Sequence, residues 1–245
     1  MKKTLFSIMA LAMTMVSCTN EVLTDVDGYG TIVLSVNNDE TVTRAAKAVA
    51  DLNGWVVKAN NGSEDITLTT ASTKVKEGTY TVSAKSHASE AEALQDKNNW
   101  GAAYYEGTSA SVEVTPGSKK NVTVECGTAK NARLKVQFNL VSNFTEYNLT
   151  AERGLVFNSE NAASALAYYA ATEEVEYTLN YNYNGTPKEI TGKITMKGAA
   201  TENIISIASN DNGTISVTVN YDDTFETGNS ENLEFDAATG DEVKE

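Results

Sequence analysis

The feature that most constrains the fold is a two-residue alternation of apolar and polar side chains, which recurs along the chain. Its clearest example is VEYTLNYNYNG, residues 175–185, where Val175, Tyr177 and Leu179 alternate with polar residues. A period of two places successive side chains on opposite faces of a strand, so that one face is buried and the other solvated. Asn184-Gly185 then supplies a turn, and the segment predicts a β-hairpin.

Similar strand patterns fill most of the remaining chain. Residues 190–196 and 213–221 repeat the alternation, and shorter segments rich in Val, Ile, Thr and Tyr precede them: TIVLSV, GWVVKA, EDITL, TYTVSA, SASVEV, NVTVEC and ARLKVQF. Helix signals are confined to Ser86–Asp96 and the alanine-rich stretch Ala162–Ala171. Many strands without helices between them predict an all-β chain built of antiparallel β-sandwiches.

A small polar link, Gly127–Asn131, separates two series of strands. We therefore expect an N-terminal β-sandwich domain at residues 28–130 and a C-terminal one at residues 131–245, each large enough for its own core. The last stretch, residues 222–245, is acidic, and we expect it to fray, although its NLEF segment is compatible with a final strand.

The N-terminus has the pattern of an export signal. Lys2 and Lys3 precede the apolar run Leu5–Val16, which is shorter than the ~20 residues that a membrane-spanning helix needs. Residues 1–17 are therefore expected to be a signal peptide and not a membrane span.

Met15-Val16-Ser17 before Cys18 resembles the lipobox of bacterial lipoproteins, in which cleavage precedes a cysteine whose sulfur is acylated. This predicts that Cys18 carries lipid, that residues 18–27 form a tether, and that the outer membrane is the first partner. The alternative is an ordinary signal peptide with an incidental cysteine.

The charge argues against two kinds of partner. The chain has a net charge of −14, and removing residues 1–17 with their two lysines leaves −16. Such a surface repels nucleic acid and anionic lipid, so attachment would depend on the anchor. We expect an outer-membrane, cell-surface location.

Residues suited to catalysis are scarce. His87 is the only histidine, and Cys126 is the only cysteine besides Cys18, so neither a common zinc site nor a Ser/His/Asp or Cys/His arrangement is predicted. We expect no disulfide within the mature chain, no metal, no cofactor and no enzymatic activity, with Cys126 as a small core residue. A glycosidase with paired carboxylates remains open, but no pair is preferred.

Three aromatic residues are candidates for ligand binding. Trp100, Tyr104 and Tyr105 lie in NNWGAAYYEG, and flat rings of this kind can stack on sugars while nearby Asn and Glu bind hydroxyl groups. The alternative is that these rings pack a loop onto the sandwich.

The segments KEGTYTVSAKS, AAYYEGTSASVEVTPGSKKNVTVEC and NARLKVQF resemble a family of Gram-negative gut-anaerobe lipoproteins catalogued as domain of unknown function number 4493. That family is similar to the fimbrillins. The resemblance implies two transthyretin-like β-sandwich domains and a role in building or anchoring pili.

In fimbrillin-type pilins an arginine after the first strand is cut, and removal of that strand opens a groove for a strand of the next subunit. Thr43-Arg44-Ala45 has this position after the predicted strand Thr31–Val36. Arg44 and Ala45 are therefore a candidate processing site, and other fimbrillin-like subunits are candidate partners. The alternative is that Arg44 only decorates a loop.

Together these patterns favour a lipid-anchored, structural or adhesive surface protein, acting as an anchor, tip or accessory component of a pilus-like assembly. The weak, acidic C-terminal strand argues against a shaft subunit. The second hypothesis is a surface lipoprotein that binds host or dietary glycans through the three aromatic residues.

Overall fold

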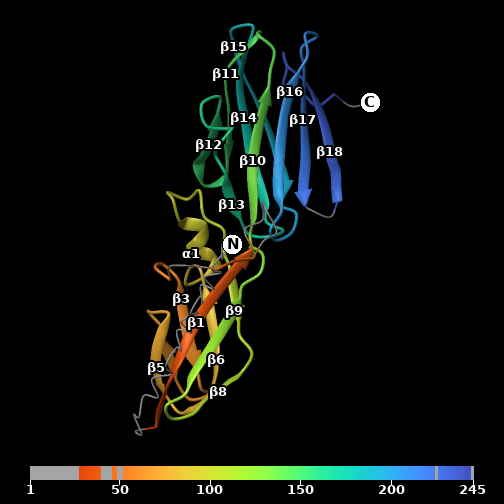
Figure 1. Ribbon diagram of the computed structural model, residues 1–245. Coiled ribbons are helices and arrows are strands. Elements are labelled where there is room, and N and C mark those ends of the chain that lie inside the picture. Colours follow the sequence, from red (N-terminus) through yellow and green to blue (C-terminus); the bar gives the residue numbers. More distant parts are fainter. Residues whose placement is uncertain (1–27, 40–45, 49–51, 224–225, 244–245) are drawn as a thin grey trace, which may run out of the picture.

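The alternating segments of the sequence form strands that pair into four sheets, two in each of two sandwiches (Figure 1). The computed structural model describes residues 28–39, 46–48, 52–223 and 226–243. One hydrophobic core draws on residues between 32 and 129, and a second on residues between 132 and 237. The predicted all-β, two-sandwich fold is confirmed. The division into domains at residues 130 and 131 stays a prediction.

The N-terminal sandwich packs a sheet centred on β1 against a sheet centred on β6. The first sheet contains β1 (Tyr29–Asp39), β2 (Ala46–Ala48), β5 (Ser72–Lys76) and β9 (Lys119–Glu125). The second has the order β4-β3-β6-β7, with β8 also paired to β6, and its strands are β3 (Val56–Asn60), β4 (Asp65–Thr67), β6 (Gly78–Lys85), β7 (Glu106–Thr108) and β8 (Val112–Val114).

The C-terminal sandwich packs a five-stranded sheet against a four-stranded sheet. The first has the order β13-β10-β16-β17-β18, with strands β10 (Ala132–Asn139), β13 (Ala167–Tyr169), β16 (Glu202–Ser209), β17 (Thr214–Asp223) and β18 (Glu226–Asp236). The second has the order β12-β11-β14-β15, with strands β11 (Phe144–Ala151), β12 (Leu155–Asn158), β14 (Glu174–Tyr183) and β15 (Thr186–Thr195).

Among the strands that the structure describes, each sandwich contains one parallel pair, and the other pairs are antiparallel. β1 runs parallel to β9, and β10 runs parallel to β16. Both leading strands also have an antiparallel neighbour on their other edge, β5 for β1 and β13 for β10. The first strand of each sandwich is therefore an inner strand, bonded on both sides.

The predicted hairpin at residues 175–195 is confirmed. β14 and β15 pair from Glu174 opposite Thr195 to Tyr183 opposite Thr186. Asn184 and Gly185 both have positive φ, at 50° and 77°, which is the conformation that a tight two-residue hairpin turn requires.

The predicted helices are corrected by the structure. The first is shorter than expected, because α1 spans only Glu90–Gln95 and begins after the N-cap Ser89, whose side chain accepts a hydrogen bond from the Glu92 N–H. Ser86, the expected start, instead pairs through its backbone with Tyr105. This pairing continues the β6 edge and delays the helix.

The expected helix at Ala162–Ala171 is wrong. The segment contains a turn followed by β13, whose residues Ala167 and Tyr169 are fully buried. They pair with Leu134 and Ala132 of β10. Burial in the sheet outweighs the helix propensity of the alanines.

The expected fraying of the acidic C-terminus is also corrected. β17 and β18 form a long antiparallel hairpin, and Phe235 and Ala237 belong to the buried core. The NLEF segment therefore forms part of a strand, as its alternation allowed.

A joint connects the two sandwiches, and α1 lies beside it (Figure 1). Arg153, in a 3₁₀ turn (Glu152–Gly154), donates hydrogen bonds to the carbonyl oxygens of Leu94 in α1 and Tyr168 in β13. Its guanidinium also lies 4.2 Å from the ring centre of Tyr169, within cation–π range. One side chain thus ties α1 to the C-terminal sandwich.

Asn131 is the second element of the joint and is 1% exposed. Its Oδ1 accepts a hydrogen bond from the Tyr104 N–H at 3.0 Å, and its Nδ2 donates to the Ala102 carbonyl oxygen at 2.7 Å. Its backbone oxygen accepts from the Ala200 N–H. Asn131 therefore bonds to both sandwiches.

Candidate functional site

Three of the predicted site residues, Cys18, Arg44 and Ala45, lie outside the described residues. Lipidation of Cys18 and processing after Arg44 therefore stay predictions. In the described part of the chain, no helix is long and apolar enough to span a membrane.

The strand that precedes Arg44 is the best-defined candidate element. β1 pairs with β9 from Thr31 to Asn37 and with β5 from Tyr29 to Val33. Ile32, Leu34 and Val36 alternate on its inner face and are 0%, 7% and 0% exposed. The strand thus fills the middle of its sheet and supplies a row of the core.

The start of β1 fits against the turn between β8 and β9 with no room for a side chain. A Cβ at Gly30 would lie 2.5 Å from Cγ1 of Val114 and 2.7 Å from the carbonyl oxygen of Thr115. The Thr31 N–H donates to the Ser118 carbonyl oxygen at 2.8 Å, and the Gly117 N–H donates to the Tyr29 carbonyl oxygen at 2.8 Å. These contacts fix the register of β1.

The three predicted aromatic residues do not share one surface. Trp100 is partly buried and meets Phe157 of the C-terminal core edge to face, with ring centres 5.0 Å apart. Tyr104 is 4% exposed and donates a hydrogen bond to Glu106 Oε2 at 2.8 Å. Tyr105 is 8% exposed and belongs to the N-terminal core. Their role in ligand binding stays a prediction.

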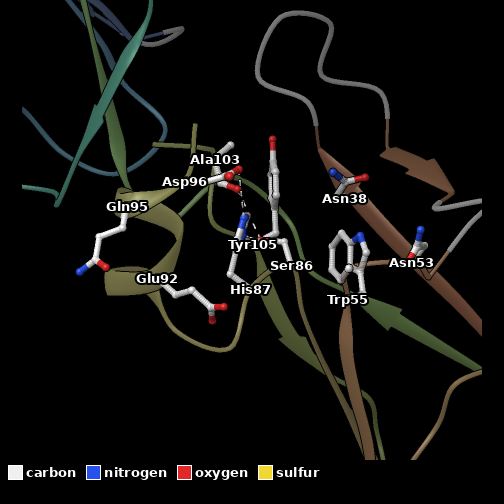
Figure 2. Close-up of a pocket in the computed structure, with 11 residues that line it drawn as sticks. Asn38, Asn53, Trp55, Ser86, His87, Glu92, Gln95, Asp96, Ala103 and Tyr105 are labelled. Carbon is white, nitrogen blue, oxygen red and sulfur yellow. Dashed lines mark hydrogen bonds and ion pairs between the residues drawn. The ribbon is translucent and has the colours of Figure 1, made fainter. Parts of the chain in front are cut away.

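A hollow of about 620 Å³ opens at the C-terminal end of β1 (Figure 2). Its walls come from four regions: the end of β1, the turn before β3, the segment after β6 with α1, and the segment before β7. Residues that line it include Asn38, Asn53, Trp55, Ser86, His87, Glu92, Asp96 and Tyr105. Of the predicted aromatic residues, only Tyr105 lines this hollow.

Ser86, His87 and Asp96 lie together in the hollow, but not as a nucleophilic relay. The Ser86 Oγ lies 3.1 Å from His87 Nδ1 and accepts a hydrogen bond from the Tyr105 N–H at 2.9 Å. His87 Nε2 lies 3.7 Å from Asp96 Oδ2, beyond hydrogen-bond distance. The serine Oγ also donates to the Ala103 carbonyl oxygen at 3.4 Å, so its two backbone bonds link the segment after β6 to the segment before β7.

Two further results concern reactive groups. Burial, assisted by nearby Glu125, raises the pKa of the Cys126 thiol to about 11, and the side chain is 2% exposed. Cys126 is therefore a protonated core residue at neutral pH, as predicted. No group of His, Cys, Asp and Glu side chains in the described ranges is arranged to hold a metal ion.

Sequence analysis missed most of the hollow. Trp55 falls in the predicted strand segment GWVVKA, and no pattern singles out Asn53. One local signal exists: the inner row of β1, Ile32, Leu34 and Val36, continues to Asn38, an amide where the alternation expects an apolar residue.

Comparison with known families decides the classification. The model of the domain of unknown function DUF4493 matches residues 28–236. The chain belongs to this family. The match spans strands of both sandwiches, from β1 to β18. None of the curated proteins compared with the chain matches it.

Two solved structures resemble this DUF4493 protein in fold. A fimbrial assembly protein from Parabacteroides distasonis is 9% identical, with a TM-score of 0.44, and the likeness covers 83% of this chain and 99% of that one. A candidate cell adhesion protein from Bacteroides ovatus is 11% identical, with a TM-score of 0.42, covering 83% and 97%.

Proposed function

We propose that the chain is a lipid-anchored, non-enzymatic surface protein of the fimbrillin type. It would have a structural or adhesive role as an anchor, tip or accessory component of a pilus-like assembly. The observation that supports this is the inner position of β1, bonded on both edges and packed into the core. Removing such a strand creates a site that a strand of another chain can fill.

Loss of β1 would expose both apolar surface and unpaired backbone. Burying Ile32, Leu34 and Val36 contributes about 1.5–3 kcal/mol for each side chain. The β9 edge from Lys119 to Glu125 would lose all its partners in β1. An apolar slot beside an open strand edge binds another strand readily.

The position of Arg44 suits such an exchange. In the sequence it lies between the end of β1 at Asp39 and the start of β2 at Ala46. A cut after Arg44 would separate β1 from every later strand. β1 would then remain in its sheet through non-covalent contacts alone.

Brief trypsin treatment of the purified protein tests the proposal. We expect cleavage after Arg44, followed by exchange of β1 for an added peptide of residues 29–39, measured by native mass spectrometry. The Arg44→Gln variant should resist the cut and take up no peptide. The same peptide with Gly30→Ala should bind more weakly, because a Cβ there meets Val114 and Thr115. Cleavage elsewhere, or a cut protein that never exchanges β1, would contradict the proposal.

The pairing of the C-terminal strand supports a subunit that accepts a strand from another chain over one that donates its own. β18 is paired with β17 along its length, and Phe235 is only 7% exposed. A strand already used in its own sandwich is poorly available to another subunit. This favours an anchor, tip or accessory component over a shaft subunit. The location that follows is the cell surface, with Cys18 as the lipid attachment site.

Glycan binding is the second candidate function, and the observation that favours it is the place of Tyr105 in the hollow. If Trp100 were the main platform, Trp100→Ala would abolish retention of the protein on a polysaccharide affinity gel. Because Trp100 meets Phe157 edge to face, we expect instead that Trp100→Ala mainly loses packing at the joint.

A further inference from the structure

We propose that the hollow at the end of β1 binds a neutral saccharide, with Trp55 as the stacking ring and Asn38 as a hydroxyl-binding amide. This site is independent of strand exchange and differs from the platform of Trp100, Tyr104 and Tyr105. Its volume of about 620 Å³ lies within the range of small-molecule sites, which is roughly 300–1,000 Å³.

Asn38 is the residue that first points to a ligand. It is 9% exposed and continues the inward row of Ile32, Leu34 and Val36. Its side chain lines the hollow. Its amide atoms are not among the enclosed, unpaired polar atoms of the described residues, which are Glu90 Oε1 and Asn143 Oδ1, so the amide is open to the hollow. A ligand hydroxyl there could both donate to it and accept from it.

Trp55 provides a fixed aromatic surface beside this amide. It packs against the N-terminal core and is partly exposed where it lines the hollow. Figure 2 shows Trp55 and Asn38 on the same side of the hollow, with the ring of Tyr105 standing between Trp55 and His87. An indole held by the core on one side can receive the apolar face of a pyranose at small entropic cost.

The polar lining favours a neutral ligand with several hydroxyl groups. Asn38 and Asn53 each carry both a donor and an acceptor, which is what a hydroxyl group requires. Glu92 and Asp96 are acidic, and no described Lys or Arg side chain lines the hollow. Phosphates, sulfates and uronic acids would therefore be repelled.

The two carboxylates of the hollow already accept backbone hydrogen bonds, which fix their position in the wall. Glu92 Oε2 accepts a hydrogen bond from the Ala88 N–H at 2.9 Å, and Asp96 Oδ1 accepts one from the Lys97 N–H at 2.8 Å. Each bond occupies one carboxylate oxygen and leaves the other able to accept from a ligand hydroxyl group.

Intrinsic fluorescence tests the proposal, because the chain has only two tryptophans. In Trp100→Phe, Trp55 is the only source of indole emission. We would titrate this variant with methyl glycosides of mannose, galactose, glucose and N-acetylglucosamine, with tetramethylammonium and glucose 6-phosphate as charged probes. The glycoside concentration would be raised to about 20 mM, well above a millimolar Kd. We expect a saturable change in emission with at least one neutral glycoside.

Asn38→Ala and Asn37→Ala, made in the Trp100→Phe background, form a matched pair. The two asparagines are neighbours on β1 but face opposite sides of the strand, and Asn37 bonds instead to Glu125. Asn38→Ala should weaken binding by about fivefold or more, as loss of one hydrogen bond predicts, while Asn37→Ala leaves it unchanged. Circular dichroism would verify that both variants fold.

Three outcomes would overturn the proposal. They are no response to any glycoside, a response to tetramethylammonium or glucose 6-phosphate alone, and binding that survives Asn38→Ala. Saturation-transfer NMR with Trp55→Phe gives a second measurement that needs no tryptophan, and transfer to the sugar should fall. None of these outcomes depends on cleavage at Arg44, so strand exchange is tested separately.

Discussion

Replacing Gly30 with alanine adds one methyl group at the tightest point of β1. The new Cβ would lie 2.5 Å from Val114 Cγ1, 2.7 Å from the Thr115 carbonyl oxygen and 3.0 Å from the Ser118 carbonyl oxygen. The valine can rotate, but the two oxygens belong to the backbone of the β8–β9 turn. Either β1 or that turn must therefore shift.

The expected loss of stability follows from two opposing effects. Overpacking of this kind costs about 1–3 kcal/mol. Alanine also restricts the unfolded chain, which returns about 0.4–1 kcal/mol. We therefore expect Gly30→Ala to lower the free energy of unfolding by about 1–2 kcal/mol.

Urea unfolding followed by circular dichroism and fluorescence would measure this change. Ser35→Ala is the control, since Ser35 lies on the exposed face of the same strand and should change stability by less than about 0.5 kcal/mol. A Gly30→Ala protein as stable as the parent would refute the assigned register of β1. A loss of equal size in Ser35→Ala would show that β1 tolerates no change at all, and the steric reasoning would fail.

Three further predictions concern the joint and the C-terminal core. Arg153→Ala removes the hydrogen bonds to the carbonyl oxygens of Leu94 and Tyr168. X-ray scattering should then show a wider range of angles between the two sandwiches. An unchanged scattering profile would contradict the role of Arg153 in holding them together. Asn131→Ala leaves buried donors and acceptors unpaired and should lower the free energy of unfolding by about 2–4 kcal/mol in urea titrations. Burial raises the pKa of Tyr181 to about 12, so its contribution to stability is complete below pH 10 and is lost as the pH rises towards 12. Tyr181→Phe should lose the hydrogen bond to the Ala237 carbonyl oxygen and so be less stable at neutral pH. Above pH 10, its unfolding midpoint should fall less steeply with pH than that of the parent protein. An identical slope in the two proteins would be evidence against a buried, neutral phenol.

The sequence predicted strands best where two signals agreed. At residues 175–195 the alternation and the Asn184-Gly185 turn both indicated a hairpin, and the structure has one. Where only composition was available, the prediction failed. The alanines at 162–171 favour a helix locally, but pairing with β10 buries Ala167 and Tyr169 in a sheet. That partner is distant in the sequence and leaves no local trace.

The hollow was beyond prediction for a related reason. Asn38, Trp55 and Tyr105 lie in separate segments, and only the pairing of β1, β3 and β6 with their neighbours brings them to one opening. Each residue has an ordinary local explanation. The break in the inward row at Asn38 would have been a usable signal, but only once the strand face was known.

The parallel pairing of β1 with β9 also affects how the molecule bears a load. β1 begins at the end of the N-terminal sandwich remote from the joint, and β9, parallel to it, also runs towards the joint (Figure 1). A pull between residue 28 and the C-terminal sandwich therefore acts along both strands, in opposite directions. The hydrogen bonds between the two strands are therefore loaded in shear and must break together. A strand peeled from its free end would release them one at a time, so this geometry gives the greater mechanical resistance.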